Sequence, residues 1–497
     1  MDVKELTTTL GNYITSNRYK FVPWWEGDHE NSMYRYSIFN QEEIEAIEAC
    51  VSACCKDALA ATAGSSGMPL FHLLGWHNLY GAVEHILNDE ALGIDVDMCD
   101  LKNKGLTPLL IACSRGNFAM AKLLIEHGAD MTHCDALGRN AYHYLASPRI
   151  EGLQNGHEGK RYALGQREQI ARLLSDGINA KDTSGQTPFS LMLQQDDANL
   201  SFALTDVFLE KGSETDIVDE DGNTLLLMAL HKRHFTAALT LAKQCSGMVN
   251  TANAKGETPM QAAKKTYNEA IRMALKDYGS TEDSEVARMD IANLSRITSN
   301  AFASFSDDER DKLSIALYLA KKLIAAIDMD DDDELGYLTE ILHNSLINDE
   351  KCHVMDFCKE AGIDFTAPIH HHGSVFCLRD KCLAPNFGVK TIKKLIEYGI
   401  DIDEAIVQGK TPVSILASTR PRNMMFSNKK DDFFENAAPF FSKESMEQLD
   451  NSGISAVHWA ARNGHCEMLK VMLEKGVDPN ITEDEPAEAG NTPLHEA

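Results

Sequence analysis

The 497-residue chain lacks two features: long apolar runs and a surplus of basic residues. No stretch approaches the ~20 consecutive apolar residues that a transmembrane helix needs, so we expect no membrane span. The first residues, MDVKEL, show no basic region leading into an apolar core, so we expect no secretion signal. Lysine and arginine number 47 against 75 acidic residues, and the formal net charge is −28. Such a surface repels nucleic-acid phosphates and favours protein partners with a basic surface.

The chain also lacks the short motifs that mark common catalytic sites. It has no Walker A loop, no H-E-x-x-H and no G-x-S-x-G. Its 12 cysteines are scattered, and some, such as Cys113 and Cys466, lie in helical patterns. This usage is typical of reduced, buried thiols in a cytosol and not of a disulfide framework. We therefore predict no catalytic residue and no cofactor, although a Cys/His pair that meets only in space stays open, with Cys54 of the N-terminal region as one candidate.

One pattern does recur, and residues 105–113, GLTPLLIAC, show it most clearly. Thr107 is placed to cap a first helix, and Pro108 suits a first turn, where no amide donor is needed. Leu109 and the small Ala112 share one helical face, so a neighbouring helix can approach closely. A second apolar stripe follows and ends at Gly128, which we expect in the left-handed conformation. The segment therefore predicts two helices and a projecting hairpin.

Openings of this kind recur in register along the chain. They begin at Gly67, Gly105, Gly138, Gly185, Gly222, Gly256, Gly409, Gly453 and Gly490. Some successive openings are 33 or 34 residues apart, close to the 33-residue period of an ankyrin array, and others are stretched by insertions. The longest insertions fall at about residues 148–165 and 419–443, where we expect loops.

The chain resembles the ankyrin-repeat family over residues 64–279 and 335–497. The resemblance implies an all-α solenoid of helix-turn-helix repeats with short β-hairpin fingers. We interpret residues 1–63 as an N-terminal helical cap and 280–334 as a helical connector or a degenerate repeat. Residues 490–497, GNTPLHEA, open a repeat without its second helix. We therefore expect the array to be truncated there.

The family resemblance predicts a non-enzymatic scaffold that binds a partner protein through its concave surface. The candidate binding residues lie between a helix-ending glycine and the next opening glycine. They are Met131, His133, Leu137, Lys181, Thr183, Ile217, Glu220, Thr251 and Lys255. The alternative is the substrate-recruiting part of a larger enzyme or bacterial effector, with its catalytic module beyond residue 497 or in residues 1–63. Irregular arrays of this kind are similar to those of effectors from intracellular bacteria, and would act in a host cytosol.

Two segments invite a metal interpretation. The acidic run 328–334 fails the EF-hand pattern, because positions six and twelve hold Asp333 and Thr339 instead of glycine and glutamate. Such a run is also favoured by the dipole of a following helix. Four cysteines and four histidines, His353 among them, lie in residues 352–382, but only one cysteine pair has zinc-like spacing. We predict core thiols and an exposed histidine tip.

We therefore predict no structural metal in residues 352–382. If stacked apolar helices supply the folding free energy, the thermal midpoint will not respond to a chelator. Elemental analysis that finds about one zinc per chain, together with unfolding on chelation, would contradict this prediction.

Overall fold

The computed structural model describes most of the chain. The described residues are 49, 51, 56–60, 62–63, 68–100, 105–147, 164–282, 290–303, 311–349, 351–372, 374–383, 387, 389–404, 410–418, 436–484 and 490–497. The chain divides into two compact units, Met1–Glu285 and Val286–Ala497, and each is described by itself. Both are predominantly helical, as expected of an all-α solenoid. Among the described residues, no helix has the length and apolar character to cross a bilayer.

Six successive helix pairs make up most of what the structure describes of the first unit. They are α4 (Leu70–Trp76) with α5 (Tyr80–Asn88), α6 (Pro108–Arg115) with α7 (Phe118–Glu126), α8 (Ala141–Ala146) with α9 (Leu164–Leu173), α10 (Pro188–Gln194) with α11 (Ala198–Glu210), α12 (Leu225–Lys232) with α13 (Phe235–Gln244), and α14 (Pro259–Lys265) with α15 (Glu269–Asp277). Before them lie α3 (Lys56–Ala60) and the antiparallel strands β1 (Thr62–Ala63) and β2 (Met68–Pro69), with Thr62 opposite Pro69. A 3-10 turn, η4 (Ser246–Asn250), follows α13.

The helices of the first unit begin where the recurring sequence pattern predicts. Thr107 precedes α6, and its hydroxyl oxygen accepts from Leu110 N at 3.3 Å, while Pro108 occupies the first helical position. Thr187 and Thr258 cap α10 and α14 in the same way, again before a proline. Gly128, after α7, is left-handed with φ +86°. The predicted cap, proline and helix-ending glycine are therefore confirmed.

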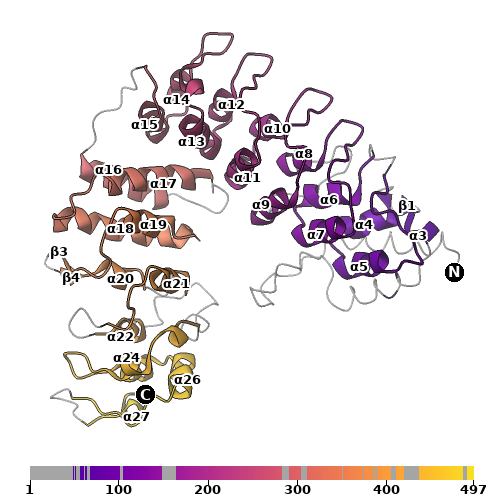
Figure 1. Ribbon diagram of the computed structural model, residues 1–497. Helices are drawn as coiled ribbons and strands as arrows, with labels where there is room; N and C mark the ends of the chain where they lie inside the picture. The colour runs from indigo at the N-terminus through magenta and orange to yellow at the C-terminus, as the bar shows by residue number, and fades with distance from the viewer. Residues whose placement is uncertain are drawn as a thin grey trace. The chain divides into compact units, whose positions relative to one another are not determined.

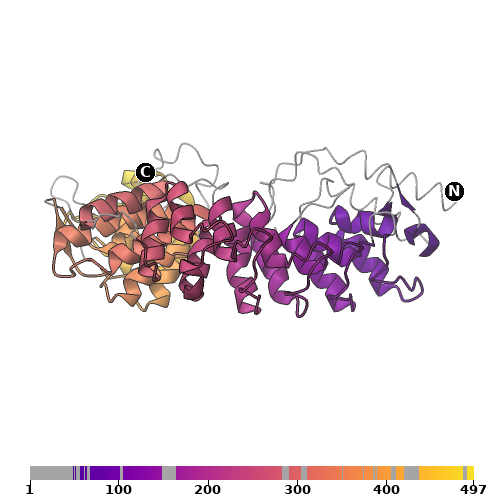
Figure 2. The same cartoon turned by 90° about the horizontal axis from the view of Figure 1, so that it is seen from above.

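The core of the first unit lies between neighbouring pairs. First helices stack on first helices, from α4 to α14, and second helices stack on second helices, from α5 to α15. Figures 1 and 2 show these helices side by side, with loops projecting from one edge in Figure 1. Leu109 and Ala112 of α6, and Leu124 of α7, are at most 1% exposed. Each pair therefore completes its apolar core with the pairs beside it.

The second unit is also built from stacked helices. Its elements are α16 (Ile291–Ala303), α17 (Asp311–Ile324), α18 (Asp332–Asn348), α19 (His353–Glu360), β3 (Ile369–His371), β4 (Ser374–Phe376), α20 (Leu378–Lys381), α21 (Val389–Glu397), α22 (Pro412–Ser418), η8 (Ala438–Phe440), α24 (Lys443–Glu447), α25 (Ala456–Asn463), α26 (Cys466–Glu474) and α27 (Pro493–Glu496). Strands β3 and β4 form an antiparallel hairpin with Ile369 opposite Phe376.

Residues 291–324, inside the segment expected to be a connector or degenerate repeat, stack as a repeat does. Helix α16 contacts α18, and α17 contacts α19, in the two-layer order of the first unit. The acidic run supplies the start of α18: Asp331 Oδ1 accepts from Asp333 N at 2.9 Å and Glu334 N at 3.2 Å. The run therefore acts as a helix cap.

Several sequence predictions fall outside the described residues. Most of the expected N-terminal cap, residues 1–63 with Cys54, is among them. So are most of the two long insertions.

A buried arginine crosses between two repeats of the first unit. Arg167 of α9 is fully buried, and its guanidinium donates to the carbonyl of Cys113 at 2.9 Å and to that of Ser114. It also reaches Tyr144 O at 3.5 Å and Leu145 O at 3.4 Å. These carbonyls lie in the last turns of α6 and α8, where backbone acceptors lack intrahelical donors and the helix dipole favours a cation.

We predict that Arg167→Met destabilises the first unit by roughly 3 kcal/mol, because buried carbonyls lose their donors. The control is Arg172→Met, five residues along the same helix. Arg172 is half-exposed and pairs with Glu168 and Glu210, so its loss should cost under about 1 kcal/mol. Urea unfolding followed by circular dichroism measures both. Equal effects of the two substitutions would contradict the role given to Arg167.

Candidate protein-binding surface

Five of the fingers, the hairpin loops that lead from one helix pair into the next, are built around an inward-pointing Asp or Asn. In the finger after α7, Asp135 Oδ1 accepts from Leu137 N and Arg139 N, both at 2.8 Å. Equivalent residues in other fingers accept in the same way, each through its Oδ1 from the backbone N–H groups two and four residues further along the chain. They are Asp182, Asp219, Asn253 and Asp450. The left-handed glycine three residues after each of them closes the turn, as at Gly138 with φ +73°. The side chain thus holds the tight turn that the backbone alone would leave loose.

Neighbouring fingers are joined through their backbones. Thr183 N donates to Leu137 O at 2.8 Å, and Ala254 N donates to Asp221 O at 3.1 Å. Side chains add to these links: Arg139 Nε lies 3.3 Å from Asp182 Oδ2. In these two cases neighbouring fingers are therefore linked and are not independent loops, and we call the side of the first unit that carries the fingers the finger edge.

Buried histidines of the first helices support the fingers from below. The Nε2 of His72 donates to Leu106 O and that of His143 to Gln186 O, each at 3.0 Å, and that of His458 donates to Ile481 O at 3.1 Å. Each acceptor lies in the finger of the following repeat. Burial lowers the pKa of all three imidazoles, because desolvation disfavours the charged form.

The structure places the predicted binding residues on this finger edge with unequal exposure. Lys181, Thr183, Glu220, Thr251 and Lys255 are exposed. Met131, His133, Leu137 and Ile217 are half-buried. All nine belong to the first unit, and they line four successive fingers.

Some of these side chains already have partners in the chain. His133 Nε2 lies 3.0 Å from Gly105 O of the preceding finger and 3.8 Å from Cys99 Sγ. Lys255 Nζ pairs with Asp221 Oδ1 at 3.0 Å, and this hydrogen bond raises the pKa of Lys255. Thr251 Oγ1 donates to Gly247 O at 2.9 Å. These three residues shape the fingers, whereas Lys181 and Glu220 are exposed without such a contact in the described part of the chain.

Val218 is a candidate that the sequence reasoning missed. Its side chain is 57% exposed, while its neighbour Ile217 is half-buried. Alternation along the finger could have revealed this, because Asp219 must point inward to hold the turn and residue 218 therefore points outward.

Two nucleophile-like pairs occur in the first unit, and neither is arranged for catalysis. Burial is the main cause that raises the pKa of Cys99, and the negative charges of Asp95 and Asp97 raise it further. The thiol beside His133 is therefore not activated. Ser201 Oγ lies 2.6 Å from His234 Nδ1, but both side chains are fully buried. No substrate could reach that hydroxyl without unfolding the repeat.

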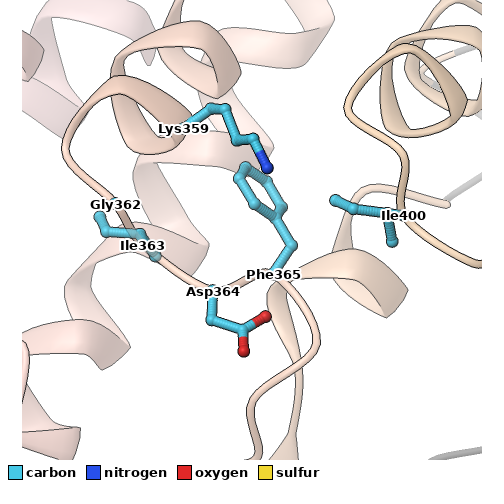
Figure 3. Close-up of a pocket in the computed structure, with 6 residues that line it drawn as sticks. All are labelled: Lys359, Gly362, Ile363, Asp364, Phe365 and Ile400. Atoms are coloured by element: carbon cyan, nitrogen blue, oxygen red, sulfur yellow. The ribbon is translucent and has the colours of Figure 1, made fainter.

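A small cavity of about 230 Å³ lies in the second unit where α19 ends. Figure 3 shows its lining: Lys359, Gly362, Ile363, Asp364, Phe365 and Ile400. Lys359 Nζ donates to Tyr398 O at 3.5 Å. Hydrogen bonds from Thr366 lower the pKa of Asp364. The cavity is smaller than the ~300 Å³ at which ordinary ligand pockets begin, and its two charged groups are engaged.

The cysteines of residues 352–382 are buried. Burial raises the pKa of Cys352 to about 11 and those of Cys358 and Cys377 to about 12, and it also raises the pKa of Cys382. Within the described ranges, no group of three or more His, Cys, Asp or Glu side chains could hold a metal ion. The absence of a metal remains a prediction for the chelation experiment.

Stacked helix pairs, Thr-Pro caps, left-handed glycine ends and joined fingers define an ankyrin solenoid. A profile of the family "Ankyrin repeats (3 copies)" matches residues 71–154 and 424–497. The chain therefore contains ankyrin repeats, a module of protein–protein interaction.

One characterised relative is the phosphocholine transferase AnkX of Legionella pneumophila subsp. pneumophila strain Philadelphia 1. The two chains are 22% identical over 218 residues. The similarity spans 43% of this chain and 20% of AnkX. It therefore covers only about a fifth of that relative.

We predict that the chain loses stability as the pH falls below about 6.5. Above that pH the imidazoles are neutral in both the folded and the unfolded chain. Below it the histidines of the unfolded chain bind protons, whereas His72, His143 and His458 in the folded chain stay neutral to a lower pH because burial lowers their pKa. The slope can reach about 1.4 kcal/mol per pH unit for each histidine. Urea unfolding at about pH 7.5 and about pH 5.5 measures the loss. His143→Gln should reduce the difference between the two pH values, and an unchanged difference would show that His143 does not contribute.

Proposed function

We propose that the chain is a protein-binding scaffold that recognises its partner through the finger edge of the first unit. The observation that carries this proposal is that some residues of a finger hold its shape while others face solvent. Inward Asp or Asn side chains and inter-finger backbone bonds fix the frame, while Lys181, Thr183, Val218 and Glu220 face solvent. A preformed frame reduces the ordering cost of binding.

The first helices contribute little exposed surface to recognition. Residues 108–114 of α6 and all six residues of α8 are buried. In α12 only the last two residues, His231 and Lys232, are exposed. The finger edge is therefore the favoured contact surface.

The charges of the fingers favour a basic partner. Around the third of these fingers, which contains Ile217 and Glu220, the exposed acidic residues are Glu214, Asp216, Glu220 and Asp221. Lys181 is a basic exception in the finger before it, and Lys255 is already paired. Complementary charge would act mainly on the association rate.

A second candidate function rests on the similarity to AnkX. The chain would be the substrate-recruiting part of a larger enzyme or secreted effector and would work in a host cytosol. The full gene sequence distinguishes the two: a further domain favours the effector, whereas more repeats with a polar terminal repeat favour the scaffold. Both candidates place recognition on the repeats.

We predict opposite rate effects for two finger substitutions. With a basic partner, Lys181→Glu should raise the association rate and Glu220→Lys should lower it, each by a few-fold at ~0.1 M salt. Both differences should shrink towards ~1 M salt, where the screening length falls from ~10 Å to ~3 Å. Stopped-flow or surface plasmon resonance with a captured partner measures the rates.

The matched control is Lys243→Glu, an exposed lysine in the last turn of α13 that changes the net charge as Lys181→Glu does. It should leave the rate nearly unchanged. If Lys243→Glu acts as strongly as Lys181→Glu, the effect belongs to the total charge, and the finger edge is not the binding surface.

A further inference from the structure

In several repeats, the turn between the two helices contains a residue in the left-handed conformation. Gly116 and Gly464 occupy this position in two repeats, both with φ +71°, and Asn78 occupies it in another with φ +55°. Glycine accepts this conformation freely, and asparagine tolerates it. The turns after α12 and α14 instead carry Arg233, with φ +60°, and Tyr267, with φ +57°.

A bulky residue at such a position costs free energy, and here packing does not offset the cost. The Tyr267 side chain is 90% exposed. In the described part of the chain, neither Tyr267 nor Arg233 makes a side-chain hydrogen bond, ion pair or ring contact. A strained backbone conformation that gains no stabilising side-chain contact indicates that the residue is kept for another role.

The two residues lie in adjacent repeats. Helix α12 stacks on α14 and α13 stacks on α15, so the two turns are neighbours on the same edge of the unit. This edge follows the carboxyl ends of α12 and α14, whereas the fingers precede their amino ends. An eight-residue helix such as α12 is about 12 Å long, so the turns form a surface separate from the fingers.

The two turns are also a basic site on an acidic chain. Lys232, Arg233, Lys264 and Lys265 end α12 and α14, and residues 231–234 and 264–268 contain no acidic residue. Lys232 pairs with Asp196 at 2.6 Å and Lys265 with Glu257 at 2.5 Å, and Arg233 remains exposed. Among the described residues, Arg233 pairs with no acidic side chain, so it is an available cation on a chain whose net charge is −28.

We propose that Arg233 and Tyr267 form a second docking site, which binds an acidic segment of a partner protein. The exposed ring supplies an apolar anchor, and the guanidinium of Arg233 binds a carboxylate beside it. Tyrosine and arginine are among the residues that most often carry interface binding energy. The site is independent of the finger edge, so the chain would hold two different segments at once.

The test uses the full chain and a random peptide library, followed by titration of the selected peptides. We expect selected peptides rich in Asp and Glu whose affinity falls about tenfold or more with Tyr267→Gly and with Arg233→Gly. Glycine suits the left-handed turn, so both variants should keep the wild-type thermal midpoint. Lys181→Glu, on the finger edge, is the control and should not weaken these peptides.

Three other outcomes decide against the proposal. Acidic peptides that bind both glycine variants as well as the wild type would place the site elsewhere. A failure to select acidic peptides, combined with Tyr267-dependent binding to phosphatidylserine vesicles, would make the turns a membrane contact. Concentration-dependent self-association that Tyr267→Gly abolishes would make them a contact between copies of this chain. Loss of finger-dependent binding alone would overturn the proposed function and leave this site standing.

Discussion

The structure depends on the burial of apolar helix faces between neighbouring repeats. Leu109 and Ala112 of α6 are buried because α4 and α8 lie on either side of their helix. No described helix pair has a core of its own, so the stability of each repeat depends on its contacts with the neighbouring repeats. This constraint explains why the small alanines and capping threonines keep their positions, whereas the finger residues differ from repeat to repeat.

A nearest-neighbour core leaves two edges of the first unit for recognition, and polar side chains fix both. On the finger edge, inward Asp135 and its equivalents hold the turns, and His143 supports the following finger from the core. On the opposite edge, a left-handed residue such as Gly116 or Arg233 sets the turn in several repeats, although the turn between α10 and α11 has none. Because the frame is fixed by one residue at each place, neighbouring positions are free to carry different side chains.

The sequence predicted the fold where local rules decide the structure. Thr107, Pro108 and Gly128 each act within one turn of chain, and their roles followed from spacing alone. Residues whose roles depend on other repeats were not predictable in this way. The charge of Arg167 suggests an exposed helix face, but the carbonyls that bind it come from α6 and α8. The same holds for His133, which bonds the preceding finger.

The candidate surface was predicted in outline and not in detail. Position between two glycines identified the fingers, and the exposure of Lys181 and Glu220 agrees with that position. It could not distinguish Ile217 from Val218, because the distinction depends on which side chain closes the turn. Tyr267 lies outside the fingers, and its importance emerges only when its backbone angle is compared with those of Gly116 and Gly464.

The buried arginine has a consequence for how the array can change length. Helices α8 and α9 belong to one pair although 17 residues separate them, 147–163. In other pairs a short turn joins the helices; here Arg167 ties α9 directly to the ends of α6 and α8. The connection no longer depends on the intervening chain. New sequence can therefore be inserted at this point, and a new loop acquired, without disturbing the register of the repeats on either side.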